Sequence, residues 1–414
     1  MNDRTSSTPT PDPADPLRPA DSPRRPISRR AALGLAAGAG LAATGALASP
    51  AAAATRAAAR TAAPRTSAAA AAQAVTPART GVPHLGAYRW GSPTGPANVT
   101  AFSQWVGDPA VWGLDFLATD TWDNIADPSW QLPAWNTWVS AQAGRNLVLS
   151  VPMLAGAWDL SGPVKGTAAG VPVSLAAGAA GDYDGYFQSL ARTLVANGLG
   201  SAWLRVGWEF NGGWYAWRAS SDTAHWPIFF QAIVGSMRGV AGADFRFIWN
   251  PALGYQQEPA DQLYPGDSYV DFVGVDAYDQ SWAANTYPWP AGSTAAQIAA
   301  AQQTAWDTDI YGGDHGLAYW KTFASDHGKY LVVPEWGVCD RTDTHGGMDN
   351  PGFVQNMYDF MVGANVPYAS YFDVNASDGA HQLSPGADGS GNPVTTEFPQ
   401  SAAKFLTLFG GPSA

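Results

Sequence analysis

Two glutamates in this sequence each follow a short apolar run. Glu209 lies in LRVGWEFNGGWYAW, residues 204–217, among five aromatic residues, and Glu335 lies in LVVPEWG, residues 331–337. Two carboxyl groups that face each other can cleave a glycosidic bond, because one protonates the leaving oxygen while the other attacks the anomeric carbon or activates water. We therefore predict Glu209 as a catalytic acid/base and Glu335 as its partner, the nucleophile.

The surroundings of the two carboxyl groups differ in the way that this chemistry needs. Glu209 follows Trp208 within an aromatic stretch, and low polarity raises the pKa of a carboxyl group toward that of a general acid. Glu335 can stay ionised if Tyr278 or Arg205 donates a hydrogen bond to it. Carboxyl groups whose environments push their pKa values apart are typical of paired acid and nucleophile roles.

Eight apolar runs alternate along the chain with segments of helical spacing. The runs are nearly continuous in apolar residues, as expected of parallel strands covered on both faces. Helical periodicity is clearest over 183–197, 226–238 and 351–363, and a shorter helix is expected near 294–306. This alternation predicts an α/β fold, a (β/α)₈ TIM barrel. An open doubly wound sheet is the alternative, but no GxGxxG follows the first run. The predicted strands are 85–90, 116–122, 146–153, 202–210, 245–249, 272–278, 330–336 and 369–374.

In such a barrel the ends of strands four and seven lie across the same opening, so Glu209 and Glu335 can converge. Long βα loops at 155–182 and 279–317 follow strands three and six and are expected at the same face. Side chains near these strand ends are the candidates for substrate contact. They are Trp208, Asn211, Trp214, Trp217, Asp276, Tyr278, Trp282 and Trp336.

Three aspartates offer alternatives for the acids. Asp276, Asp373 and Asp120 also end predicted strands or follow them closely. They could bind sugar hydroxyls or hold the rim of the barrel instead. A pair formed by Asp276 and Glu209 would make an inverting mechanism possible.

Composition narrows the class of partner. The sequence has 19 Trp, 15 Tyr and 16 Phe but only 14% charged residues, and exposed aromatic rings suit the apolar faces of sugars. After residue 80, 12 basic residues oppose 30 acidic ones, a formal net charge of −18, so nucleic acid and anionic membranes are poor partners. Six histidines without HxH or HExxH spacing predict no metal site, and no nucleotide motif predicts a cofactor.

The N-terminal part of the chain is not expected to belong to the fold. Paired arginines precede an Ala/Gly/Leu-rich run and small residues, so residues 1–54 are predicted to be a twin-arginine export signal. Residues 55–80 are predicted to be a disordered linker rich in Ala, Thr and Arg. Residues 81–414 then form one catalytic domain of a secreted protein that we expect to be a monomer.

Three stretches resemble glycoside hydrolase family 26. WEFNGGW is similar to the acid/base strand of that family, VPEWG to its nucleophile strand, and DFVGVDAYD to the strand whose tyrosine contacts the nucleophile. The resemblance implies retention of configuration through a glycosyl-enzyme, with carboxylates about 5–5.5 Å apart. An open cleft and the supply of aromatic residues favour an endo-acting enzyme on a β-linked polysaccharide, β-1,4-mannan first.

One position departs from the family. Its members usually carry His just before the acid/base, where this chain has Trp208, and most of the wider clan carries Asn there to bind the sugar 2-hydroxyl. β-Xylan and β-glucan therefore stay open as substrates. A non-catalytic carbohydrate-binding barrel is the rival from another functional class, and transglycosylation would use the same covalent intermediate as hydrolysis.

Overall fold

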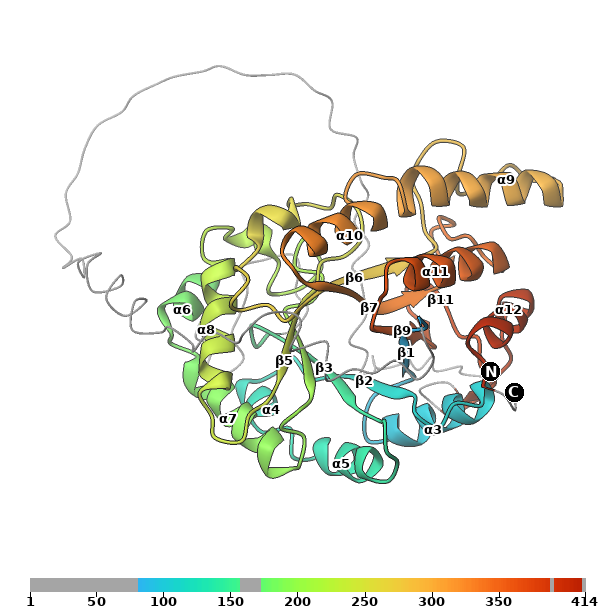
Figure 1. Ribbon diagram of the computed structural model, residues 1–414. Coiled ribbons are helices and arrows are strands. Elements are labelled where there is room, and N and C mark those ends of the chain that lie inside the picture. Colours follow the sequence, from blue (N-terminus) through green and yellow to red (C-terminus); the bar gives the residue numbers. More distant parts are fainter. Residues whose placement is uncertain (1–80, 157–172, 388–390, 412–414) are drawn as a thin grey trace, which may run out of the picture.

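Eight parallel strands close into a barrel in the computed structural model, which describes residues 81–156, 173–387 and 391–411. The strands follow one another around the barrel in sequence order, and helices surround them (Figure 1). This confirms the predicted (β/α)₈ TIM barrel. The predicted signal and linker, residues 1–80, lie outside the described residues, as do residues 157–172 of the first long loop.

The barrel strands are short and almost entirely buried. Each pairs in parallel with both of its neighbours, and β7 closes the barrel onto β9, which pairs with β1. Parallel strands covered by helices on the outside and by side chains within the barrel have no solvated face, which explains their continuous apolar runs. Their bounds are β1 His84–Tyr88, β2 Trp112–Phe116, β3 Leu147–Val151, β4 Trp203–Val206, β5 Arg246–Trp249, β6 Phe272–Tyr278, β7 Tyr330–Gly337 and β9 Tyr368–Phe372.

The helices begin and end largely where the sequence pattern places them. The Asn350 side chain accepts a hydrogen bond from the Phe353 backbone N–H and caps a helix that begins with Pro351, as predicted. Thr294 and Gln297 form a capping box at the start of the helix expected near 294–306. The helices are α3 Gly95–Val106, α4 Trp122–Ala126, α5 Leu132–Ser140, α6 Leu175–Ala180, α7 Asp184–Ala196, α8 Trp226–Arg238, α9 Ala295–Ala305, α10 Leu317–Asp326, α11 Pro351–Gly363 and α12 Pro399–Phe409. Shorter elements are the 3₁₀ turns Ala219–Ser221 and Ala260–Leu263, the π-turn Trp306–Ile310, and the short strands β8 Asp340–Arg341, β10 Asn375–Ala376, β11 Gly379–Ala380, β12 Gly386–Ala387 and β13 Pro393–Val394.

The side chains that fill the barrel change in character from one end to the other. Near the N-terminal ends of the strands they are aromatic, and the Trp203 ring stacks on Phe272 with centroids 4.2 Å apart. Gly86 makes room for this layer, since a Cβ there would lie 2.6 Å from the Tyr368 hydroxyl. Two residues further along β4, Arg205 is fully buried in a polar layer. Polar groups therefore gather inside the C-terminal end of the barrel, where TIM barrels carry their active sites.

Two strands end four or more residues before their predicted ends. The second strand is Trp112–Phe116, because residues 117–122 leave the barrel and lead into α4. The fourth strand ends at Val206, four residues before the predicted end, because Gly207 adopts a positive φ of 58° and turns the chain. Glu209 consequently lies on a turn and not within the strand.

Candidate active site

A tight turn after β4 carries Glu209 over the end of the barrel. Gly207 has no room for a side chain, because a Cβ would lie 2.3 Å from the Met153 sulfur. Glu209 itself has φ +50°, a conformation that costs a non-glycine residue about 1–3 kcal/mol. Its backbone N–H donates to the Asn250 carbonyl at 2.7 Å, which ties the turn to the end of β5. A strained, anchored backbone of this kind is typical of functional positions.

Glu335 is held by a cation and a phenol. The Arg205 guanidinium lies 2.6 Å from one carboxylate oxygen, and the Tyr278 hydroxyl donates to the other at 2.8 Å. The Glu335 side chain is almost fully buried. Charge-assisted contacts of this kind fix the orientation of a carboxyl group. Arg205 and Tyr278 are the two partners predicted for Glu335 from the sequence.

Arg205 is the centre of the polar layer beneath the site. It also pairs with Asp276 at 2.6 Å and donates to Asn250 at 3.0 Å and to Ser150 at 3.1 Å. The buried guanidinium thus faces two carboxylates, and their charges raise its pKa against the opposing effect of burial. Arg205 is a positioning residue, because it acts through Glu335.

Glu209 has the opposite environment. Burial of its carboxyl group, together with the negative charge of Glu335, raises the pKa of Glu209 to about 8. The Trp214 indole N–H donates to Oε2 at 2.8 Å and Arg205 contributes positive charge, both of which lower the pKa, but burial dominates. Glu209 is therefore protonated at neutral pH and can act as a general acid.

This pKa sets an expected pH profile. A general acid must hold its proton, so kcat/KM should fall as the pH rises through about 8. The Trp214 N–H stabilises the anionic form of Glu209, so Trp214→Phe should raise the pKa and move this basic limb to higher pH. Values of kcat/KM across pH 5–10 on a polysaccharide, whose leaving group needs the proton, provide the measurement. If the basic limb of Trp214→Phe lies at the same pH as in the unmodified protein, or at lower pH, the assignment of Glu209 as the general acid is contradicted.

Trp282 belongs to an exposed cluster at the rim. It is 40% exposed, its ring is stacked with His345, and the Arg341 guanidinium lies 5.2 Å from its centroid. Arg341 in turn pairs with Asp378 at 3.2 Å, and the charge of Asp378 contributes to the raised pKa of Glu209. Trp282 thus exposes part of its side chain on the loop after β6, at the face of the barrel that carries the two carboxyl groups.

Two tryptophans predicted at the substrate lie instead in the core beneath the turn. Trp208 is fully buried and donates its indole N–H to the Tyr215 hydroxyl at 2.7 Å, and Trp217 is 1% exposed and donates to the Trp208 carbonyl at 2.9 Å. Their rings pack with centroids 4.4 Å apart. Both support the Glu209 turn from below, and neither offers a surface to a sugar.

Trp336 is likewise turned away from the site. Side chains alternate along a strand, so the residue after Glu335 points to the outside of the barrel. Its ring is fully buried and stacks on Phe405 of α12 with centroids 5.8 Å apart. The prediction of a substrate contact is corrected to a packing role between β7 and α12.

Asn211 and Asp276 are engaged with the protein. The Asn211 amide donates to the Ala252 carbonyl at 3.0 Å and accepts from the Ala252 N–H at 2.9 Å, joining the loops after β4 and β5. Asp276 is 2% exposed and lies beside Glu335 on the neighbouring strand, paired with Arg205. Burial raises the pKa of Asp276, against the effect of Arg205. We assign Asn211 to the loop structure and Asp276 to positioning, in place of the predicted substrate contacts.

The other two aspartates have structural partners. Asp373 is fully buried and accepts hydrogen bonds from the Leu383 and Ser384 backbone N–H groups and from the Ser384 hydroxyl. Asp120 is exposed and accepts from the Asn124 amide at 2.8 Å. Neither is arranged as an alternative acid.

Two residues of the site were not predicted from the sequence. Asn250 contacts both Arg205 and the Glu209 backbone, and His381 packs its ring 5.0 Å from that of Tyr278. Asn250 directly follows β5, and a polar residue at the end of an apolar strand could have marked it. His381 lies on a long return from β9, where no strand or helix pattern signals its position.

Comparison with known proteins agrees with this geometry. Residues 198–301, which include Glu209 and Tyr278, match the sequence model of glycosyl hydrolase family 26. Over this range the chain is similar to glycosyl hydrolase family 26. The matched range contains two of the three motifs, WEFNGGW and DFVGVDAYD, and it confirms the resemblance predicted from them.

Individual relatives are distant in sequence. Endoglucanase H of Acetivibrio thermocellus is 30% identical over 114 residues, which cover 25% of this chain and 12% of that protein. A double mutant of the Cellulomonas fimi endo-β-1,4-mannanase has a similar fold, with a TM-score of 0.51 at 17% identity over 81% of this chain and 72% of the other. A second structure, of a modular endo-β-1,4-mannanase from Cellulomonas fimi, gives 0.50 at the same identity and coverage. The chain thus matches only a small part of the curated relative.

No metal-binding group was found in the described part of the chain. Within residues 81–156, 173–387 and 391–411, no three His, Cys, Asp or Glu side chains are grouped to hold a metal ion. Over the same residues, every helix is too short or too polar to cross a membrane.

Proposed function

We propose that the protein is a retaining, endo-acting glycoside hydrolase of β-linked polysaccharides, β-1,4-mannan first. One observation carries this proposal: the Arg205 guanidinium and the Tyr278 hydroxyl both contact the Glu335 carboxyl group, while burial raises the pKa of Glu209 to about 8. An ionised nucleophile beside a protonated acid is the arrangement that double displacement at an anomeric carbon requires. A non-catalytic sugar-binding barrel does not require two carboxyl groups in such different environments.

The reaction follows from these contacts. Glu335 attacks the anomeric carbon while Glu209 donates its proton to the glycosidic oxygen, so the C–O bond breaks and a glycosyl ester forms on Glu335. Glu209, now a carboxylate stabilised by the Trp214 N–H, takes a proton from water. The resulting hydroxide attacks the anomeric carbon and displaces Glu335. The sugar is released with its original anomeric configuration. An acceptor sugar in place of water would give transglycosylation.

The preference for mannan is supported by the named activity of the Cellulomonas fimi enzyme with the same fold. A β-glucan is the second candidate, because the relative from Acetivibrio thermocellus is named an endoglucanase. Trp208 leaves this choice open, because its indole N–H is already bonded to Tyr215 and offers no polar contact to a sugar.

A polysaccharide panel tests the function. We expect the purified protein to release reducing ends from soluble galactomannan, with a rapid fall in viscosity that marks internal cleavage, and to act less on xylan and mixed-linkage β-glucan. Faster cleavage of β-glucan than of galactomannan would identify β-glucan, and not mannan, as the substrate. Absence of turnover on all three would contradict the proposed hydrolase.

Export remains part of the proposal and rests on the sequence alone. The paired arginines Arg29 and Arg30 precede the apolar run. If they direct twin-arginine export, replacing both with lysine should retain the protein inside the cell, as fractionation would detect.

A further inference from the structure

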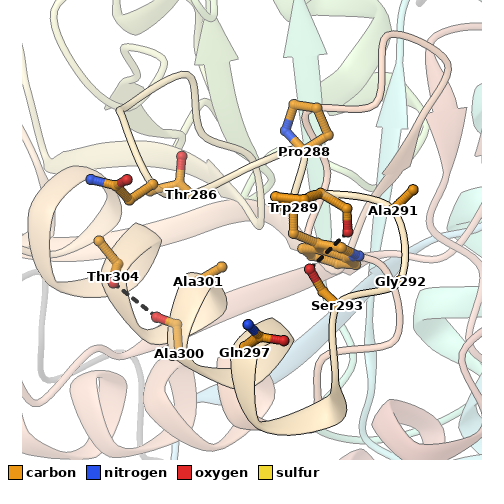
Figure 2. Close-up of a pocket in the computed structure, with 12 residues that line it drawn as sticks. Thr286, Pro288, Trp289, Ala291, Gly292, Ser293, Gln297, Ala300, Ala301 and Thr304 are labelled. Carbon is orange, nitrogen blue, oxygen red and sulfur yellow. Dashed lines mark hydrogen bonds between the residues drawn. The ribbon is translucent and has the colours of Figure 1, made fainter.

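A pocket lies between the loop after β6 and helix α9. It has a volume of about 470 Å³ and is lined by residues from 285–293 and by the facing side of α9. Figure 2 shows the Trp289 indole on the loop side and Gln297 with Ala301 on the α9 side. None of its lining residues belongs to the site around Glu209 and Glu335.

The chemistry of the lining selects an uncharged, hydroxyl-rich ligand. Trp289 is half-buried and supplies an aromatic ring, while Asn285 and Gln297 supply amides. No charged side chain is among the twelve lining residues, so an anion or cation would find no partner there. An aromatic ring beside neutral donors and acceptors suits a pyranose, whose C–H face is apolar and whose edge carries hydroxyls. The volume falls within the range of small-ligand sites, about 300–1,000 Å³.

Both walls of this pocket are anchored. Tyr287 lies two residues before Trp289 on the loop. It is buried, and its hydroxyl donates a hydrogen bond to Asp279 at 2.6 Å. Asp279 also accepts from the Asn350 amide at 2.9 Å. On the opposite wall, the Thr294–Gln297 capping box fixes the first turn of α9. A site held in this way loses little conformational entropy when it binds a ligand.

The anchor also connects the pocket to the catalytic groups. Asp279 directly follows Tyr278, whose hydroxyl holds Glu335. The loop that begins at this catalytic contact passes the exposed Trp282 and then reaches Trp289. Aromatic side chains thus recur along one loop, from the reacting carboxylate to the pocket.

We propose that the pocket formed by residues 285–293 and α9 is a secondary glycan site that binds pyranose units of the polysaccharide by stacking on Trp289. This rests on the proposed function for the identity of the ligand. The pocket adds contacts to a polymer that is held at the catalytic groups, so it raises affinity for long chains without taking part in bond cleavage.

The test compares two tryptophan variants. In an inactive Glu335→Gln background, affinity gel electrophoresis with galactomannan, xylan and mixed-linkage β-glucan measures binding without hydrolysis. Trp289→Ala should weaken binding of the preferred polysaccharide on the order of tenfold, the loss of about 1.4 kcal/mol, and Trp289→Phe should restore most of it. Trp130→Ala is the matched control, because Trp130 is 52% exposed and lies outside the pocket. In the active enzyme, kcat/KM on a short aryl glycoside should not change with Trp289→Ala.

The outcomes separate this proposal from the proposed function. Unchanged polysaccharide binding in Trp289→Ala, an equal loss in Trp130→Ala, or binding of none of the three polysaccharides by the parent would overturn the secondary site. A fall in aryl-glycoside kcat/KM would also overturn it, because Trp289 would then act on the catalytic groups. Trp289-dependent binding by a protein that hydrolyses no polysaccharide would contradict the hydrolase and leave the glycan site standing.

Discussion

Glu335→Ala is expected to lower turnover of polysaccharide by about 10⁵-fold, the scale of loss when a covalent nucleophile is removed. Azide should restore activity on an activated aryl β-glycoside, because the small anion can enter the space that the carboxylate leaves. It would attack the anomeric carbon from the face that Glu335 occupied and give an α-glycosyl azide. Initial rates with and without azide, and NMR of the product, measure both effects.

The chain offers a matched control for this change. Of its four glutamates, Glu397 is exposed, so Glu397→Ala should retain full activity. Arg205 keeps Asp276 as a partner in the Glu335→Ala protein, so the barrel should stay folded, as circular dichroism can verify. Retained turnover in a folded Glu335→Ala protein would remove Glu335 from the mechanism.

Glu209→Ala is expected to separate substrates by their leaving groups. Without its proton, kcat/KM on polysaccharide should fall by about 10²–10⁴-fold, the usual contribution of general acid catalysis. An aryl glycoside whose phenol leaves without protonation should keep most of its kcat/KM, because this constant reports the first step alone. Its kcat should fall, since no base then activates water in the second step.

A second variant tests the same role for Glu209 through pH. The basic limb near pH 8 should be absent from the residual kcat/KM of Glu209→Gln on polysaccharide, because the titrating group is gone. Equal losses on polysaccharide and aryl glycoside, or a basic limb that persists in Glu209→Gln, would assign the acid to another residue.

The parts of the fold that follow from local patterning could be predicted from sequence. Buried parallel strands give apolar runs and surface helices give a 3.6-residue period, so the order of elements in the barrel was evident. The end of β4 was not evident, because the turn depends on the close approach of Gly207 to Met153, two residues that follow different strands. The end of β4 was predicted wrongly because it is set by contacts between segments that are distant in the sequence.

In the site, too, some features follow from local patterning and others depend on contacts between distant segments. Glu209 and Glu335 could be placed near each other because strand ends of a barrel share one face. The tryptophans could not be sorted, since a ring that stacks on sugar and a ring that packs in a core have the same sequence signal. Trp282 is exposed, whereas Trp208 is buried and bonded to Tyr215. Only packing between elements separates these two cases.

Trapping of the glycosyl-enzyme tests the central claim most directly. A 2-deoxy-2-fluoro β-glycoside of the preferred sugar with an activated leaving group slows hydrolysis of the intermediate, so the label accumulates on the nucleophile. Peptide mapping by mass spectrometry then locates the modified residue. The account predicts one label per chain, on Glu335 in the peptide that contains VVPEWG. A label on Glu209 or Asp276, or turnover with inversion and no covalent intermediate, would contradict it.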